Sequence, residues 1–247
     1  MIAARMDVKQ PGQDVLEPGG GSWASAGVSA LERGLAVLDA LGEAGRPIPL
    51  AELSRRTGFH KSTLLRVLAS LERCRYAVRL ADGRYRLGPM LLRLGQAYSR
   101  GFDLHAALEP VLARLAAETR EAASFFIREG DGRLCLARAE GRQEVRDVVT
   151  IGAVLPLQGA AGHVLRLFEA GPRPDLPPVQ ASFGERTPEV GALSVPVFRQ
   201  GRGQGSVLAG ALTLSGTVTR FRDEAHRAAM SAVLLREAAA LTRELDG

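Results

Sequence analysis

The chain has 247 residues, of which 46% are hydrophobic, and a formal net charge of +5. No apolar run approaches the roughly 20 residues that a membrane-spanning helix needs, which excludes a membrane-spanning protein. The first 27 residues lack the apolar core of a secretory signal. Cys74 and Cys135 lie far apart and suggest neither a disulfide framework nor a metal site. These features predict a cytoplasmic protein with a disordered leader at residues 1–27 and without a cofactor.

Positive charge is confined to one part of the chain. Residues 28–100 contain 13 basic and 6 acidic side chains, whereas residues 101–247 contain 17 basic and 18 acidic ones. A local excess of this kind is typical of a module that binds a polyanion. An arginine-rich genome explains many arginines but does not explain why their excess is localised. We therefore predict a nucleic-acid-binding unit attached to a nearly neutral body.

Three helices are expected at the start of this basic segment. The first is SALERGLAVLDALGEAG, with Ser29 as its N-cap, leucines at helical spacing and a glycine at its end. The second is LAELSRRT, which follows a proline and ends at Gly58. The third runs from about His60 to Arg73 and places an apolar stripe opposite polar residues. The tight turn between the last two predicts a helix-turn-helix.

A two-stranded hairpin is expected after the third helix. YAVRL and RYRLG alternate apolar and basic residues on either side of Asp82-Gly83, a dipeptide that favours tight hairpin turns. Three helices and such a hairpin make a winged helix-turn-helix, here residues 28–88. The major groove of duplex DNA admits one helix, and the flanking phosphates attract cations and hydroxyl donors. The sequence therefore predicts binding to double-stranded DNA.

The third helix is the expected recognition helix. Its first turn carries cationic and hydroxyl side chains, and the free N–H groups there also favour phosphate. Arg66, one turn later, is placed to reach a base edge, whereas the hairpin arginines are expected to meet the DNA backbone or the minor groove. The candidate DNA-binding residues are His60, Lys61, Ser62, Thr63, Arg66, Arg84 and Arg86.

Three stretches carry a resemblance to a known family. LERGLAVLDAL, IPLAELSRRTGFHKSTLLRVLASLE and DGRYRLGPMLLRLG closely resemble the N-terminal half of the isocitrate lyase regulator (IclR) family of bacterial transcription factors. The resemblance extends through the second domain to the C-terminus. It implies that Lys61, Ser62, Thr63 and Arg66 belong to the recognition helix. It also implies that residues 89–102 form a linker helix that joins the domains and helps to pair subunits.

Residues 103–247 predict an α+β domain. A long helix precedes three strand-like runs, ASFFIREG, RLCLARAE and VRDVVTIG. LPLQGAAG then enters a helix in which Val164, Leu165 and Leu167 are expected to be buried. VGALSVPVF and SVLAGALTLSG are the remaining expected strands, and a helix from about Arg220 closes the chain. An antiparallel sheet with flanking helices follows, and it is similar to the GAF-like effector-binding domain of the same family.

The resemblance also implies a pocket for a small organic-acid effector. The loop LPLQGAAG offers small residues and free N–H groups at a helix start, which suit a carboxylate. The segment at about 171–189, where the family usually has two further helices, is Pro-rich and too short for both. Thr213 and Ser215 either bind the effector or satisfy each other or the backbone inside the sheet. Carried over position by position, the pocket falls on Leu155, Gly159, Ala160, Ala161, Ser182, Ala192, Thr213 and Ser215.

The leading hypothesis is a sequence-specific DNA-binding transcriptional regulator, repressor or activator, controlled by an organic-acid effector and acting as a homodimer or homotetramer. No catalytic serine, phosphate-loop or zinc-protease motif is present, so no enzyme is expected. Two alternatives stay open. One is a constitutive DNA-binding dimer whose C-terminal domain only oligomerises. The other is an enzyme that the basic module tethers to nucleic acid.

Overall fold

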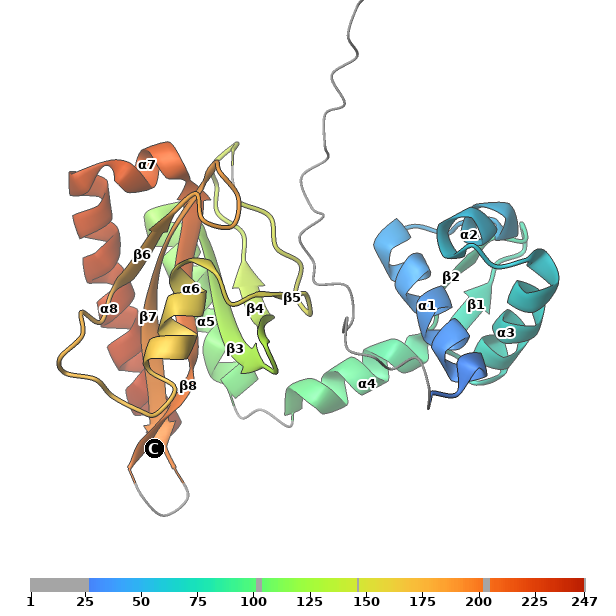
Figure 1. Cartoon of the computed structure of the whole chain (residues 1–247), viewed down its shortest axis with the longest axis horizontal. Helices are drawn as coiled ribbons and strands as arrows, with labels where there is room; N and C mark the ends of the chain where they lie inside the picture. Colours follow the sequence, from blue (N-terminus) through green and yellow to red (C-terminus); the bar gives the residue numbers. More distant parts are fainter. Residues whose placement is uncertain (1–26, 101–103, 146, 202–204, 247) are drawn as a thin grey trace, which may run out of the picture. The chain divides into compact units, whose positions relative to one another are not determined.

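The computed structural model describes residues 27–100, 104–145, 147–201 and 205–246. The chain divides into two compact units, and the boundary falls between Phe102 and Asp103 (Figure 1). The leader expected at residues 1–27 lies outside the described residues except for its last position.

The N-terminal unit consists of three helices, a two-stranded hairpin and a fourth helix (Figure 1). Its elements are α1 (Ser29–Ala44), α2 (Leu50–Thr57), α3 (Lys61–Arg73), β1 (Ala77–Arg79), β2 (Tyr85–Leu87) and α4 (Pro89–Arg100). Gly45 and Gly58 end the first two helices in the left-handed region, with φ of 59° and 71°, which glycine adopts without steric cost. The expected helix-turn-helix and hairpin are confirmed. The N-cap of α1 is Val28, however, and Ser29 is its first helical residue.

The core of this unit determines which side of α3 faces solvent. Buried apolar side chains from the helices and the hairpin pack together, namely Val37, Leu41, Ile48, Leu53, Leu64, Leu68 and Tyr85. Each large apolar side chain buried in this way contributes about 1.5–3 kcal/mol. Ile48 and Tyr85 also exchange two backbone hydrogen bonds, of 2.9 and 2.8 Å, which tie the hairpin to the α1–α2 connection. Because Leu64 and Leu68 turn inward, the opposite side of α3 is left outside the core.

The C-terminal unit is built on one antiparallel sheet, with strand order β5-β4-β3-β8-β7-β6. Its strands are β3 (Ala122–Glu129), β4 (Gly132–Ala139), β5 (Val154–Pro156), β6 (Gln180–Phe183), β7 (Val190–Gln200) and β8 (Ser206–Thr217). The long strands β7 and β8 pair over their whole length, with Ala192 opposite Ser215 and Ser194 opposite Thr213. Residues opposite each other in a sheet share a face, so these four side chains line one side together.

Helices cover both faces of this sheet (Figure 1). They are α5 (Leu104–Thr119), α6 (Gly159–Leu167), α7 (Val218–Arg222) and α8 (Glu224–Asp246). The first and last of these pack against each other and cover one face, whereas α6 lies on the opposite face. Beneath α6 is an apolar cluster that includes Phe126, Cys135 and Ala211. The α+β class expected from the sequence is therefore confirmed.

Several local expectations for this unit are wrong. The run VRDVVTIG forms no strand in its described residues, and the strand beside β4 is β5 instead. The short segment before the last strand pair contains β6, an edge strand that its prolines concealed. Leu167 is 40% exposed, and Phe168 is buried in its place. The terminal helix is two helices, separated at Asp223.

Candidate functional site

Helix α3 presents its first turn to solvent. His60 occupies the N-cap position, but its side chain makes no capping hydrogen bond. Lys61, Ser62 and Arg66 are exposed, and Thr63 is half-buried. Within the described part of the chain, neither Lys61 nor Arg66 forms an ion pair. The first turn therefore offers hydroxyls, free backbone N–H groups and the unpaired Lys61, and Arg66 adds a second unpaired cation one turn later. This is the chemistry that a phosphate backbone and a base edge require.

The hairpin places its three arginines differently. Arg79 lies over the Tyr85 ring, with its guanidinium carbon 5.8 Å from the ring centroid. Arg84 is held by Asp82, whose carboxylate accepts from the side chain at 2.7 Å and from the backbone N–H at 3.0 Å. Arg86 is exposed and has no ion-pair partner among the described residues. Of the two predicted hairpin contacts, Arg86 is therefore free, whereas Arg84 is already paired.

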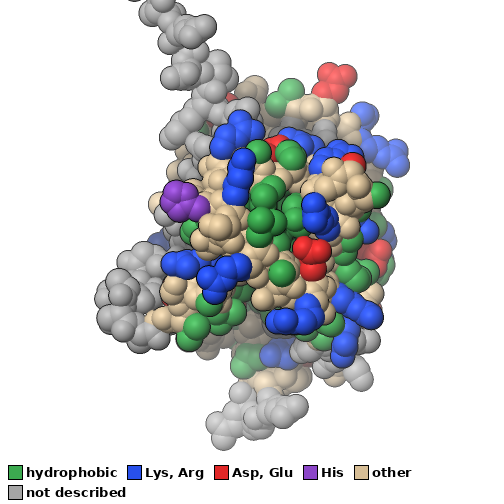
Figure 2. Space-filling view, turned by 90° about the vertical axis from the view of Figure 1, so that its right-hand side faces the viewer, with side chains coloured by type: hydrophobic (Ala, Val, Ile, Leu, Met, Phe, Trp, Pro, Cys, Tyr) green, Lys and Arg blue, Asp and Glu red, His purple; other side chains and the backbone are tan. Residues whose placement is uncertain are grey.

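The charge excess of this unit is partly neutralised within α2. Arg46 and Arg56 share the carboxylate of Glu52, at 2.9 and 3.1 Å. On the face shown in Figure 2, lysine and arginine side chains surround an apolar centre, and acidic side chains are few. The positive charge that reaches solvent unpaired therefore includes Lys61, Arg66 and Arg86.

An apolar groove of about 740 Å³ lies between α1, α3 and α4. Thr63 and Arg66 line one part of it, so α3 contributes to both the charged surface and the groove. Leucines line much of the rest, and Leu31, Leu35 and Leu94 are 62%, 52% and 46% exposed. Exposed apolar patches of this kind mark interaction surfaces.

The C-terminal unit contains a cavity of about 30 Å³, on the face of the sheet that α6 covers. Six of the eight predicted pocket residues line it, namely Gly159, Ala160, Ser182, Ala192, Thr213 and Ser215. The other two, Leu155 and Ala161, are buried in the apolar cluster beneath α6 and do not line the cavity. The structure thus brings together residues that are up to 56 positions apart in the sequence.

The hydroxyl groups of the cavity differ in their partners. The Oγ1 atom of Thr213 is 2.9 Å from the Oγ atom of Ser194, so this hydroxyl is already satisfied within the sheet. Ser182 and Ser215 are 6% and 5% exposed, and their hydroxyls make no side-chain hydrogen bond to any described residue. Thr213 and Ser215 do not pair with each other. The alternative of satisfaction inside the sheet holds for Thr213, which also donates to the backbone carbonyl of Ala211 at 3.5 Å, but not for Ser215. Ser182 and Ser215 therefore stay available to a ligand.

The start of α6 is occupied by a side chain of the protein itself. The carboxylate of Glu185 accepts a hydrogen bond from the Gly159 N–H at 3.1 Å and lies 3.0 Å from Nε2 of His163. A carboxylate is favoured here because the first N–H groups of a helix have no partner within it. The helix start at which the sequence predicted an effector carboxylate is thus occupied by the carboxylate of Glu185 in this structure.

Sequence reasoning missed the charged residues of the cavity. Arg133, Asp147 and Arg186 all line it. A signal for Arg133 was present in the sequence. It lies two positions before the buried Cys135 on β4, and residues two apart on a strand face the same side of the sheet. No such signal existed for the other two, which lie in irregular segments and meet only in the folded chain, where they form an ion pair of 2.8 Å.

The described residues contain no group of three or more His, Cys, Asp or Glu side chains that could hold a metal ion. None of their helices combines the length and the apolar character that crossing a membrane requires.

Two family models match this chain. The IclR helix-turn-helix domain matches residues 30–81, and the bacterial transcriptional regulator IclR C-terminal domain matches residues 96–170. Together they cover about half of the chain. This protein belongs to the IclR family. The first IclR match includes the recognition helix, and the second includes the start of α6 but stops before Ser182 and the cavity residues that follow it.

Named relatives and solved structures agree with the IclR assignment. The regulator KipR of Bacillus subtilis is 33% identical over 114 residues, a region that spans 46% of each chain. The Thermotoga maritima IclR structure has a TM-score of 0.71 at 18% identity and covers 88% of this chain and 98% of its own. An IclR homologue from Microbacterium hydrocarbonoxydans, solved with 4-hydroxybenzoate, has a TM-score of 0.68 at 21% identity and covers 88% and 99%. At these identities the two structures show the shared fold.

Proposed function

We propose that this protein is a sequence-specific DNA-binding transcriptional regulator, repressor or activator, whose affinity for its operator is controlled by a small organic acid. The observation that carries the proposal is the first turn of α3. It is exposed and carries Lys61, which is unpaired among the described residues, as is Arg66 one turn later. Both lie within the segment that matches the IclR helix-turn-helix domain. Lys61, Ser62 and Thr63 bind phosphate oxygens, and Arg66 contacts a base edge in the major groove.

The regulator acts as a homodimer or homotetramer in the cytoplasm. The part of the groove that α1 and α4 line with Leu31, Leu35 and Leu94 is the surface that a second copy would cover, because these exposed leucines are costly to leave in water. Two recognition helices related by a two-fold axis would read half-sites about 34 Å apart or a multiple of that distance. The operator is therefore expected to be a palindrome.

The effector binds in the cavity at the start of α6. Support comes from the two unsatisfied serine hydroxyls, from the helix N-terminus and from the related Microbacterium protein, which was solved with an aromatic acid. A ligand shifts DNA affinity only through its different affinity for the two arrangements of the protein. Membership of the IclR family supports a binding protein over an enzyme.

Competition binding tests the DNA proposal. The full-length protein is titrated into a labelled fragment from upstream of its own gene, at two salt concentrations, with random-sequence DNA as competitor. We expect the fragment to be preferred by at least about 10³-fold over random DNA. Equal affinity for both DNAs would refute the proposal.

A constitutive DNA-binding dimer is the second candidate, and the small size of the cavity favours it. Thermal unfolding of the full-length protein with a panel of organic acids separates the two. A ligand present at 100 times its Kd adds about 2.7 kcal/mol to the free energy of unfolding. Unfolding temperatures that stay the same with every acid would select the constitutive binder.

A further inference from the structure

Arg133 is a buried cation without a partner. It is the second residue of β4 and is 6% exposed, and its Nε atom has no hydrogen-bond partner. The guanidinium carbon lies 4.8 Å from the centroid of the Phe126 ring, and the guanidinium forms no ion pair with a described residue. Burial, followed by the nearby charge of Arg186, lowers the pKa of Arg133 to about 10. Because that pKa is still well above 7, the side chain stays charged at neutral pH.

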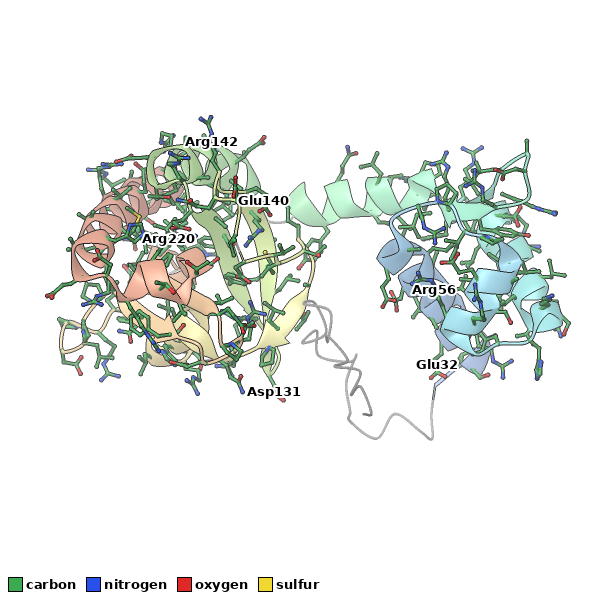
Figure 3. All side chains as sticks on the ribbon, turned by 90° about the horizontal axis from the view of Figure 1, so that it is seen from above. Glu32, Arg56, Asp131, Glu140, Arg142 and Arg220 are labelled. Carbon is green, nitrogen blue, oxygen red and sulfur yellow. The ribbon has the colours of Figure 1, made fainter. Side chains whose placement is uncertain are left out.

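Arg138, a second buried arginine on the same strand, has hydrogen-bond partners for its guanidinium. The side chain of Arg138 is 3% exposed. Its guanidinium bonds the carboxylate of Glu140 at 2.7 Å, the hydroxyl of Ser124 at 2.9 Å and the backbone carbonyl of Asp147 (Figure 3 labels Glu140). A buried charge is normally compensated in this way, because an unpaired one is costly. Arg133 therefore stands out as the exception.

The acidic groups near Arg133 are engaged elsewhere. Asp147 pairs with Arg186 at 2.8 Å, and both of these side chains are largely buried. Glu185 bonds the Gly159 N–H and lies against His163. Among the described lining residues the charged side chains are two arginines and one aspartate, so the cavity carries an excess of one positive charge.

The guanidinium of Arg133 and the hydroxyl of Ser182 both lie close to the start of α6, around the position where Gly159 has no side chain. A Cβ atom built on Gly159 would lie 3.3 Å from Oγ of Ser182 and 4.0 Å from Nη2 of Arg133. The missing side chain of Gly159 therefore leaves a gap bounded by a cation, a free hydroxyl and a helix N-terminus. All three favour a negatively charged oxygen atom.

We propose that Arg133 is the charged contact of the effector, which is a compact organic carboxylate whose acid group binds Arg133 and Ser182 in place of the contact that Glu185 makes with Gly159. This inference rests on the effector site of the proposed function. A cavity of about 30 Å³ holds about one or two water molecules. Binding therefore moves the segment that carries Glu185 outward, and Glu185 acts as an internal competitor of the ligand.

Two charge changes of opposite effect test the proposal on the full-length protein. Calorimetric titration uses acetate, pyruvate, succinate, benzoate and 4-hydroxybenzoate, each beside its amide, and inorganic phosphate. We expect at least one acid to bind while its amide does not. Arg133→Met should weaken that acid about tenfold or more, and Glu185→Gln should tighten it several-fold. Arg128→Met, which removes an exposed arginine that lies directly opposite Arg133 on β3 and pairs with Glu169 at 2.9 Å, should change the Kd less than twofold.

Each outcome of these titrations either supports the proposal or overturns it. An unchanged Kd in Arg133→Met, a response to phosphate alone, or no response of the wild-type protein to any acid would each overturn the proposal. Should Arg133→Met fail to fold, Arg133→Lys and Arg133→Gln replace it, with retention of binding expected only in the lysine variant. The operator affinity of every variant is measured without acid and should stay unchanged. A wild-type protein that binds an acid through Arg133 but shows no promoter preference would refute the proposed function and leave this inference standing.

Discussion

Asp82 and Arg84 form a closed ion pair at the tip of the β1–β2 hairpin, with 2.7 Å between the guanidinium and the carboxylate. The same carboxylate also accepts the backbone N–H of Arg84 at 3.0 Å and so shapes the turn. The side-chain hydrogen bond from Arg84 is the main reason why the pKa of Asp82 lies below its usual range. An arginine expected to meet DNA phosphate is thus held by an acid two residues away.

Replacing that acid should strengthen DNA binding. Asp82→Asn keeps an oxygen for the turn, removes a negative charge that repels phosphate and frees Arg84. We expect tighter binding to every DNA sequence and a salt dependence that steepens by up to about one counterion. Fluorescence anisotropy at several salt concentrations measures both. A variant that binds as the wild type does would show that Arg84 does not approach the DNA.

The same pair sets a pH expectation. Because the pKa of Asp82 is lowered, the carboxylate stays charged above its ordinary pKa of about 4, and the pair is lost only as the pH falls through the lowered value. The difference in DNA affinity between Asp82→Asn and the wild type should therefore be constant from about pH 5.5 to 8. A difference that changes within this range would contradict the assignment.

Arg66 should contribute to specificity more than to general affinity. Arg66→Ala is expected to cost about 1–3 kcal/mol on the operator and much less on random DNA, because a base contact exists only on the right sequence. Arg86→Ala is the matched control, since the loss of a phosphate contact weakens binding to all sequences alike. An unchanged ratio of operator to random affinity in Arg66→Ala would demote Arg66 to a backbone contact.

Glu121 and Arg220 hold one end of the strand that carries Thr213 and Ser215. The carboxylate of Glu121 is fully buried and accepts two bonds from Arg220, at 2.6 and 2.8 Å (Figure 3 labels Arg220). Removing one partner of such a pair leaves a buried charge. Arg220→Met should therefore lower the free energy of unfolding by about 3 kcal/mol, at the low end for buried pairs because Arg220 is 27% exposed.

Urea unfolding measures this loss, provided that the slope of the transition stays constant. The double variant Glu121→Leu with Arg220→Met should recover most of the stability, because it removes both charges. A single variant as stable as the wild type would show that the pair contributes nothing.

The leucine groove predicts the oligomeric state. Leu35 is 52% exposed on α1 and lines the groove. Leu35→Glu should shift the assembly toward monomer in light-scattering measurements without lowering the unfolding temperature of the isolated subunit, because the side chain lies outside the core. Leu41→Glu, at a position that is 2% exposed, should instead unfold the domain. An unchanged mass for Leu35→Glu would exclude this groove as the dimer contact.

The secondary structure of the N-terminal unit could be read from local signals. Helical spacing of leucines, two terminating glycines and the Asp82-Gly83 turn each act over a few residues, so the sequence predicted the helix-turn-helix and its hairpin. The apolar stripe of α1 was less informative, because Leu31 and Leu35 belong to a second face that the core leaves exposed. Periodicity reveals that a face is apolar but not what covers it.

Local pattern by itself determined the two-unit organisation, the α+β class and the charged turn of α3, because periodicity, capping and turn chemistry act between neighbours along the chain. Tertiary structure alone decided that Glu185 occupies the start of α6 and that Arg133 is buried on the side of the sheet that carries Ser182. Those contacts join strands and loops many residues apart, and strand register is set by the packing of the whole sheet. The charge balance of the cavity is therefore a property of the folded chain.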